Sequence, residues 1–221
     1  MNEATANVPD LVPILPLPEA VLFPRQVLPL HVFEPRYRAM VADALAGAKL
    51  IAVALLKPNY EPHYFTSRAP IHRLVGIGRI IAAEKLNEGK FNILLRGEAR
   101  ASMLAELQGR PYRVARIQTI EPRCNASSAI RARLRRALLE AVRQHLATRA
   151  DACEQYLQWF EAPFSLGELT DLIAGQLPVV GEVRQCLLAE LETCTRAKML
   201  LRQVRTLGDV ARRPRRADQR T

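Results

Sequence analysis

The sequence predicts an α+β protein in which a β-rich part with one inserted helix comes first and an all-helical part follows. Between Val12 and Pro122, short apolar runs are interrupted by Pro and Gly, a pattern typical of strands and turns. The residues that follow Phe33 break this pattern with helical spacing. From Ser127 onward, apolar residues recur every three to four positions, as in amphipathic helices. Strands segregated from helices in this way argue against an alternating α/β fold.

Seven strands are expected in the β-rich part. Prolines inside the first two indicate edge, bulged or broken strands, because proline cannot donate a ladder hydrogen bond. Gly76 and Gly78 in the fourth run indicate a bulge or a tight corner. Asn87-Glu88-Gly89 is a turn signal that predicts a hairpin. The expected strands are Val12–Leu17, Val27–Val32, Leu50–Leu56, His72–Leu86, Lys90–Arg96, Arg100–Leu107 and Tyr112–Glu121.

The inserted helix is expected to begin at Phe33-Glu34-Pro35, where Pro35 suits the first helical turn. One apolar stripe runs along it at spacings of three and four, and Gly47 is a plausible stop. The stripe consists of Tyr37, Met40, Val41, Ala44 and Leu45.

The helical part is expected to contain four helices. Ser127 or Ser128 can cap the first, and Ser165-Leu166-Gly167-Glu168 fits a capping box that opens the third. The expected helices are 127–146, 151–161, 165–176 and 181–207. The resulting domain prediction is 10–122 for the β-rich part, 123–207 for a helical bundle and 208–221 for a basic tail without fixed structure.

Composition narrows the class of protein. The chain has 221 residues and a formal net charge of +10, and 24% of its residues are charged. Its length and its 49% of hydrophobic residues are sufficient for a hydrophobic core that needs no disulfides. The longest apolar run, Leu50–Leu56, is far shorter than the about 20 residues that span a bilayer. The first ten residues carry no signal-peptide pattern. We therefore expect a cytoplasmic protein without a membrane partner.

Familiar catalytic and cofactor motifs are missing from the sequence. It contains no phosphate-binding G-x-x-x-x-G-K-[ST] loop, no G-x-S-x-G elbow and no H-E-x-x-H. The four cysteines form no C-x-x-C pair, and the four histidines are scattered, so buried, reduced thiols are expected rather than a zinc site. We expect no catalytic residue, no cofactor and no metal.

One segment is too particular for composition to explain. Leu17–Pro24 reads L-P-E-A-V-L-F-P, and Val27–Met40 reads V-L-P-L-H-V-F-E-P-R-Y-R-A-M. Together with Val75–Gly78 and the helical stretches Leu169–Ala174 and Arg184–Leu188, they resemble the amino-terminal substrate-binding domain of ATP-dependent Lon proteases. The resemblance spans roughly residues 10–206 and is greatest to stand-alone bacterial proteins that carry this domain.

The resemblance implies a PUA-like β-barrel followed by an α-helical bundle. It also implies a non-enzymatic module for protein or peptide binding in protein quality control, because the ATPase and Ser–Lys peptidase motifs of the full protease are absent. In the segment Gly97–Ala101 this sequence has Ala101 where the family often has an aromatic residue. The implied partner is unfolded or extended polypeptide.

Besides a cleft expected between the barrel and the helical bundle, two surfaces are candidates for that binding. One is the F-E-P-R-Y run with Phe33, Glu34, Arg36 and Tyr37, for which a structural role at the start of a helix is the favoured interpretation. The other is the loop Lys57–Pro70, whose aromatic residues are Tyr60, Tyr64 and Phe65.

RNA binding is the alternative function, since related PUA-like barrels bind RNA. The distribution of charge along the chain favours RNA binding less than the net charge of +10 suggests. Residues 123–149 carry seven arginines and one glutamate, whereas residues 150–195 carry eight acidic residues and one arginine. The basic excess therefore belongs mostly to the helical part, and the aromatics of the β-rich part are not interleaved with arginine as in a base-stacking platform.

Overall fold

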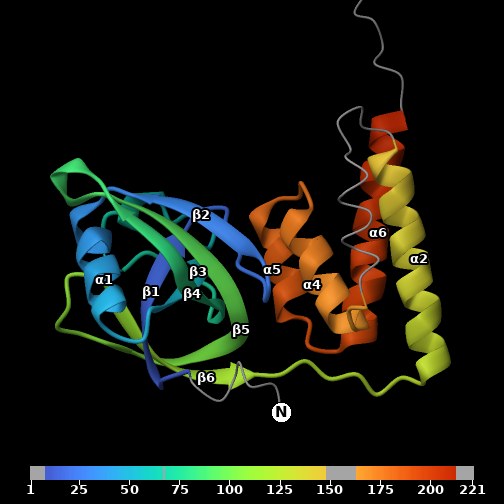
Figure 1. The fold of residues 1–221 in the computed structure, drawn as a ribbon, viewed down its shortest axis with the longest axis horizontal. Coiled ribbons are helices and arrows are strands. Elements are labelled where there is room, and N and C mark those ends of the chain that lie inside the picture. Colours follow the sequence, from blue (N-terminus) through green and yellow to red (C-terminus); the bar gives the residue numbers. More distant parts are fainter. Residues whose placement is uncertain (1–7, 67, 148–162, 213–221) are drawn as a thin grey trace, which may run out of the picture. The chain divides into compact units, whose positions relative to one another are not determined.

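The computed structural model describes residues 8–66, 68–147 and 163–212, and these form one six-stranded sheet and five α-helices (Figure 1). The α+β class is confirmed. The strands are β1 (Leu11–Leu17), β2 (Val27–Val32), β3 (Leu50–Leu55), β4 (Leu74–Lys85), β5 (Phe91–Leu107) and β6 (Arg113–Ile120). The helices are α1 (Pro35–Ala46), α2 (Ser128–Leu146), α4 (Leu166–Gln176), α5 (Gly181–Ala189) and α6 (Thr193–Arg212), with 3-10 turns η1 (Glu61–His63) and η2 (Asn87–Gly89).

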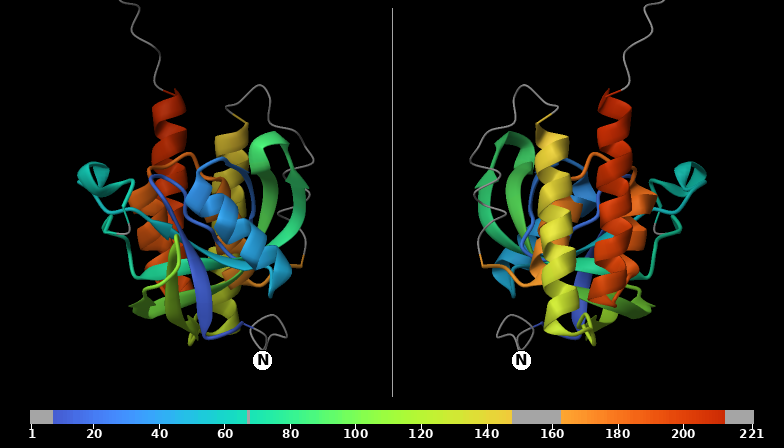
Figure 2. Two further views of the ribbon diagram at one scale, coloured as in Figure 1. Left: turned by 90° about the vertical axis from the view of Figure 1, so that its left-hand side faces the viewer. Right: turned by 90° about the vertical axis from the view of Figure 1, so that its right-hand side faces the viewer.

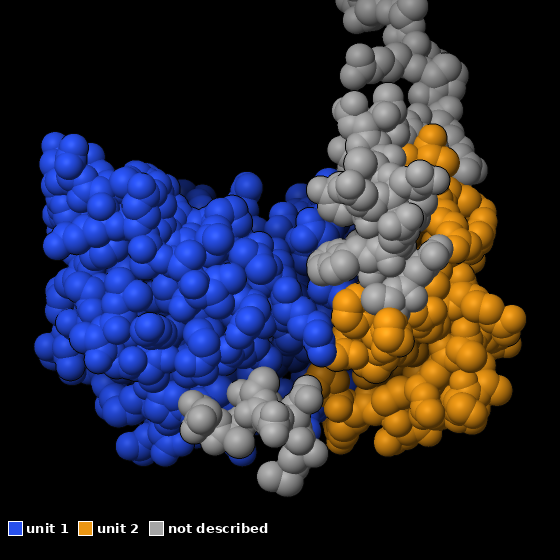
Figure 3. Space-filling view, viewed as in Figure 1, with its two compact units in different colours: residues 1–121, 171–191 blue, residues 122–170, 192–221 orange. Residues whose placement is uncertain are grey.

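The chain divides into two compact units, which we describe separately (Figure 3). The first unit comprises Met1–Glu121 and Asp171–Leu191, so it contains every strand together with α1, α5 and the second half of α4. The second comprises Pro122–Thr170 and Glu192–Thr221, with α2 and α6.

In the first unit the strand order is β2-β5-β4-β3-β1-β6, and β6 pairs with β5 as well as with β1. Among the described strands, only β1 and β3 pair in parallel, and the other pairs are antiparallel. The pairing therefore passes in a closed circuit through β5, β4, β3, β1 and β6. Strand β2 lies outside this circuit and pairs with β5 alone among the described strands.

Two glycines let the Leu22–Phe23 segment cross closely over the sheet. A Cβ atom on Gly76 would lie 1.9 Å from the Leu22 carbonyl oxygen, and one on Gly97 would lie 2.0 Å from that of Phe23. Both distances are far below contact, so no side chain fits at either position. Leu22 and Phe23 are themselves fully buried. The V-L-F-P and V-G-x-G motifs are thus two sides of one packing contact.

Helix α1 forms as its sequence predicts, from Pro35 to a stop at Gly47. Its buried residues, Tyr37, Met40, Val41 and Ala44, pack in one core cluster with apolar residues from one face of β1, β3 and β5. A second cluster on the other side of the sheet includes Val12, Ala52, Val75 and Ile117. Strand β3 is buried along its whole length, as its unbroken apolar run predicts.

The two strands expected at Lys90–Arg96 and Arg100–Leu107 are one strand of 17 residues, β5. The sequence interruption between them is a β-bulge. Ile77 pairs with Ala99 and Gly78 with Gly97, which leaves Glu98 as the extra residue. A bulge bends a strand without ending it, so the break in alternation was a poor guide to the strand boundary.

The prediction of a single helix at 181–207 is also wrong, because the chain forms two helices there, α5 and α6. Glu190 adopts an extended conformation with φ −75° and ψ 109°. Within the second unit, the Thr193 amide then donates to the Arg123 carbonyl at 2.8 Å, and the Glu192 carboxylate accepts from the Thr195 amide at 2.6 Å. These bonds start a new helix at Thr193.

The other helices of the second unit follow their sequence signals. Ser127 caps α2, and Ser165 and Glu168 exchange the two hydrogen bonds of a capping box at the start of α4. Helices α2 and α6 run side by side in both views of Figure 2. The expected helix 151–161 and residues 213–221 of the tail lie outside the described residues. None of the described helices is both long and apolar enough to cross a membrane.

Candidate functional site

Arg36 joins the start of α1 to the loop that follows β3. Its Nε donates to Glu34 Oε2 at 3.0 Å, and its Nη2 and Nη1 donate to the carbonyls of Tyr64 and Thr66 at 3.0 and 3.4 Å. Its guanidinium also lies 4.5 Å from the centre of the Tyr37 ring. The guanidinium is thus committed to holding local structure, which supports the structural interpretation of the F-E-P-R-Y run.

The loop aromatics gather around Arg36. Tyr60 and Tyr64 have ring centres 5.8 Å apart, and Tyr64 meets Phe65 edge-on at 5.0 Å. Phe65 is 81% exposed, whereas both tyrosines are half-buried. The structure therefore brings six of the seven predicted site residues into one group, which we name the Arg36 cluster. Its members are Glu34, Arg36, Tyr37, Tyr60, Tyr64 and Phe65.

Burial controls the phenols of the Arg36 cluster. Loss of hydration raises the pKa of Tyr37 to about 12, against a partial opposing effect from the Arg36 charge. Burial also raises the pKa of Tyr64, and the Glu34 carboxylate adds to this shift. Both phenols stay protonated in the neutral range, so they act as packing and hydrogen-bonding groups rather than as bases.

The seventh predicted residue, Phe33, lies apart from the Arg36 cluster. It is 59% exposed and stacks on His31 of β2, with ring centres 6.1 Å apart. His31 Nδ1 donates to Asn92 Oδ1 at 2.8 Å, and Asn92 Nδ2 donates to Glu84 Oε2 at 3.2 Å. Phe33 therefore stands at the end of a polar row that crosses β2, β5 and β4.

Beside this polar row the same three strands present an apolar one. Pro29 of β2 pairs with Leu94 of β5, which pairs in turn with Ala82 of β4, and all three are exposed. Val27 of β2 and Ile81 of β4 are also exposed apolar residues, each 45% exposed. A groove of about 560 Å³ runs over these strands. We call this surface the β2–β5–β4 face. Exposed apolar patches of this kind commonly mark binding sites.

Strand β2 also offers backbone hydrogen-bonding groups. The Gln26 carbonyl accepts from the Gly97 amide at 2.8 Å, so residues of even number face β5. Alternation then turns the backbone groups of Val27, Pro29 and His31 outward. Proline contributes no donor, which leaves the amides of Val27 and His31 and three carbonyls along this edge.

A buried ion pair inside the first unit was not foreseen as a site. Arg100 on β5 is 1% exposed and donates to both carboxylate oxygens of Asp171 on α4, at 2.9 and 2.5 Å. Its Nε donates to the Leu188 carbonyl of α5 at 3.0 Å, and its guanidinium lies 6.0 Å from the centre of the Phe23 ring. We name this group the Arg100 junction. The available sequence signal was a charged residue beside apolar neighbours, with Arg100 between two alanines and Asp171 before Leu172–Ala174.

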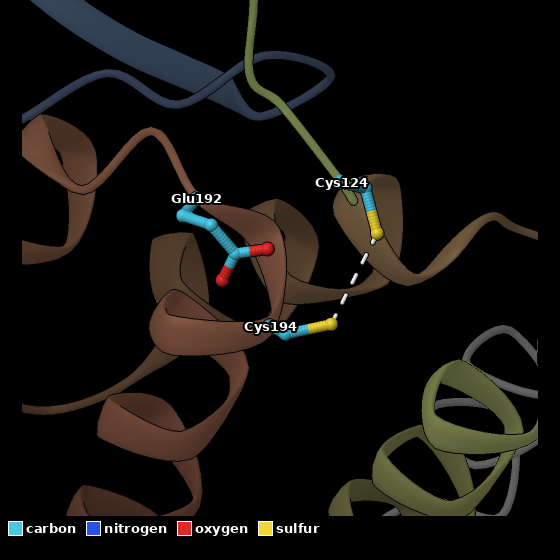
Figure 4. A group of neighbouring side chains, drawn as sticks. All are labelled: Cys124, Glu192 and Cys194. Atoms are coloured by element: carbon cyan, nitrogen blue, oxygen red, sulfur yellow. Dashed lines mark hydrogen bonds between the residues drawn. The ribbon is translucent and has the colours of Figure 1, made fainter. Parts of the chain in front are cut away.

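A third cluster lies in the second unit, where Cys124, Glu192 and Cys194 converge (Figure 4). The two sulfur atoms are 4.0 Å apart, and all three potential ligand atoms lie within 4.8 Å of one another. Burial raises the pKa of the Cys194 thiol, and its contacts with Cys124 and Glu192 add to the shift. The sequence placed these cysteines 70 residues apart and gave no sign of their contact.

The amino-acid sequence matches the model of a protein family. The model for the substrate-binding domain of ATP-dependent protease La (LON) matches residues 11–206. The chain therefore belongs to the LON substrate-binding domain family, and the resemblance inferred from the sequence is confirmed.

Individual proteins give the same result. The chain is 28% identical to the Lon protease of Anaeromyxobacter dehalogenans over 88% of its length, and 30% identical to Lon protease 2 of Herpetosiphon aurantiacus over 90%. These matches cover only 23% and 24% of the two relatives.

Two solved structures share the fold. The N-terminal domain of a Mycobacterium avium complex Lon protease has a TM-score of 0.65 at 19% identity and covers 88% of this chain and 97% of its own. The Lon N-terminal domain protein from Xanthomonas campestris has a TM-score of 0.57 at 20% identity and covers 87% and 97%.

Proposed function

We propose that this chain is a non-enzymatic module that binds unfolded or extended polypeptide along the edge of β2 and the adjoining β2–β5–β4 face. The observation that carries the proposal is an exposed edge strand whose apolar row, Pro29, Leu94 and Ala82, lies beside outward-facing backbone groups that no other described strand pairs with. Membership in a substrate-binding domain family supports the same function.

An extended peptide can add to such an edge as a further strand. The outward amides of Val27 and His31 supply donors, and the carbonyls of the same strand supply acceptors. Main-chain hydrogen bonds give affinity that depends little on peptide sequence, while alternate side chains enter the apolar groove. This mode suits a binder that must accept many unrelated segments.

We also infer that the closed circuit of β5, β4, β3, β1 and β6 is a PUA-like barrel and that the second unit is a helical bundle. Under this interpretation β2 is an addition to the barrel wall, which explains why its outer edge is available. The Arg36 cluster then serves mainly to hold the loop after β3, with Phe65 and Phe33 as exposed aromatics that can extend the binding surface.

Fluorescence anisotropy with a labelled, chemically unfolded polypeptide tests the proposal. We expect saturable binding by the intact chain and a loss of at least tenfold in affinity for Leu94→Asp. Leu104→Asp is the matched control, because Leu104 is also an exposed leucine of β5 but lies away from the groove. Absence of saturable binding, or equal losses in both variants, contradicts the proposal.

Hydrogen exchange distinguishes strand addition from side-chain docking alone. On binding, the outward amides of Val27 and His31 should gain protection, while the amides of Leu28 and Leu30 are already protected by β5. Binding without new protection at Val27 and His31 contradicts strand addition.

RNA binding stays a prediction with its own test. Filter binding across a salt series should give an affinity that falls steeply with ionic strength if phosphate contacts carry it. RNA binding that survives Leu94→Asp, with no polypeptide binding, favours the alternative.

A further inference from the structure

We propose that Cys124, Glu192 and Cys194 form a binding site for a thiophilic divalent cation, with zinc as the expected ion. The three residues come from two segments that the second unit brings together, the stretch after β6 and the start of α6 (Figure 4). Two thiols and a carboxylate are a ligand set that zinc accepts readily and that calcium and magnesium do not.

The sulfur separation fits a shared metal better than a disulfide. Two zinc–sulfur bonds of about 2.3 Å at a tetrahedral angle place the sulfurs about 3.8 Å apart. The observed 4.0 Å is close to that distance. A disulfide requires about 2.0 Å, so the same sulfurs would have to approach by half their separation.

Backbone contacts hold the two segments in place before any ion binds. Arg123 and Glu192 form an isolated parallel bridge, and the Thr193 amide donates to the Arg123 carbonyl at 2.8 Å. Cys124 follows Arg123 directly, and Cys194 lies in the first turn of α6, where it is 5% exposed. Backbone hydrogen bonds therefore hold the two segments that carry the ligands, which lowers the entropy cost of ordering them around an ion.

Glu192 can serve the ion and the helix at once. Its carboxylate accepts from the Thr195 amide at 2.6 Å, in the first turn of α6. A carboxylate has about four acceptor positions, so helix capping does not prevent coordination. On binding, the two thiols give up their protons to the buffer, and the three ligands leave the fourth position of the ion for water.

Such an ion would tie together residues that are 70 positions apart. Because the unfolded chain does not hold these ligands together, binding would stabilise the second unit. The test uses reduced chain with Cys153→Ser and Cys186→Ser, which removes the other two cysteines and leaves only the proposed pair.

Cobalt(II) is the spectroscopic probe. We expect one equivalent to bind with thiolate-to-cobalt charge-transfer absorption, to be displaced by zinc, and zinc to raise the midpoint of thermal unfolding. Cys124→Ala and Cys194→Ala should each abolish the absorption. Glu192→Gln should weaken binding at least tenfold while keeping an acceptor for the Thr195 amide, so a folded variant remains available if a cysteine variant fails to fold.

Each other result overturns the proposal. These results are no charge-transfer absorption in the reduced double variant, absorption that persists in Cys124→Ala, or unchanged affinity in Glu192→Gln. Complete conversion of the pair to a disulfide in air, with no metal binding by the reduced form, would identify a redox pair instead. Cys186→Ser alone is the matched control, since Cys186 is exposed on α5 and is not part of the cluster.

Discussion

The Arg100 junction and the Arg36 cluster each use an arginine to connect a strand-rich region to other elements. The two arginines differ in how far their side chains are buried from water. The Arg100 guanidinium is 1% exposed and binds the Asp171 carboxylate through two hydrogen bonds. The Arg36 side chain is 17% exposed and pairs with Glu34, while its other donors reach two loop carbonyls and its guanidinium lies over the Tyr37 ring. Removing one partner of a buried ion pair is costly, because the other charge stays buried without it. When a partly exposed arginine is removed, water can replace part of its hydrogen bonding.

The largest effect is expected from Arg100→Ala. Removal of the guanidinium leaves the Asp171 carboxylate in a buried site without its bidentate donor, and the Leu188 carbonyl loses its bond as well. We expect the free energy of unfolding to fall by about 3–5 kcal/mol, measured by urea denaturation. A loss below about 1 kcal/mol would show that water enters the junction and that the contrast with Arg36 is false.

The pair Arg100→Met with Asp171→Leu sharpens this comparison. Exchange of a buried ion pair for apolar residues of similar volume is often neutral, because both desolvation costs vanish together. The double variant should therefore be more stable than Arg100→Met alone, with a coupling energy of about 1–3 kcal/mol in a double-mutant cycle. Additive losses would show that the two residues act independently.

Arg36→Ala should cost less, about 1–2 kcal/mol, because water can replace part of its hydrogen bonding. Its local effect should be clear, since the carbonyls of Tyr64 and Thr66 lose their donor. We expect faster hydrogen exchange in residues 57–66. The control is Arg38→Ala on the same helix, because Arg38 donates to the Glu88 carbonyl instead and should leave this loop unchanged.

The smallest effect concerns Tyr37 and pH. The pKa of Tyr37 is about 12 in the folded chain against an ordinary 10.0, so the folded state keeps its proton where the unfolded state loses it. The stability that this phenol contributes is complete below pH 10 and decreases as pH rises toward 12. Urea denaturation at several pH values should show a shallower alkaline decrease for Tyr37→Phe. Equal slopes would contradict the shift.

Local signals in the sequence were sufficient for most elements of the first unit. Pro35 and Gly47 mark the two ends of α1 because both act through backbone geometry within one turn. Strand β3 was recognisable because seven apolar residues in a row fit a strand buried on both faces. The bulge at Glu98 and the break between helices at Glu190 could not be recognised from the sequence, since both depend on partners distant in sequence.

The same distinction between local signals and distant partners applies to the candidate sites. The F-E-P-R-Y motif and the loop aromatics were visible as composition, but their meeting around Arg36 was not, because backbone carbonyls of the loop supply the contacts. The apolar row of Pro29, Leu94 and Ala82 depends on strand register. No pattern along the chain gives that register, because β2 and β5 are separated by α1, β3 and β4.

By itself the sequence determined the α+β class, the family and most helix and strand positions, because these depend on residues within a few positions of one another. The tertiary structure alone decided that β2 lies at an edge, that Arg100 finds Asp171, and that Cys124 meets Cys194. Each is a pairing across 59 residues or more. Such pairings follow from the packing and charge burial of the whole fold, which local propensity does not encode.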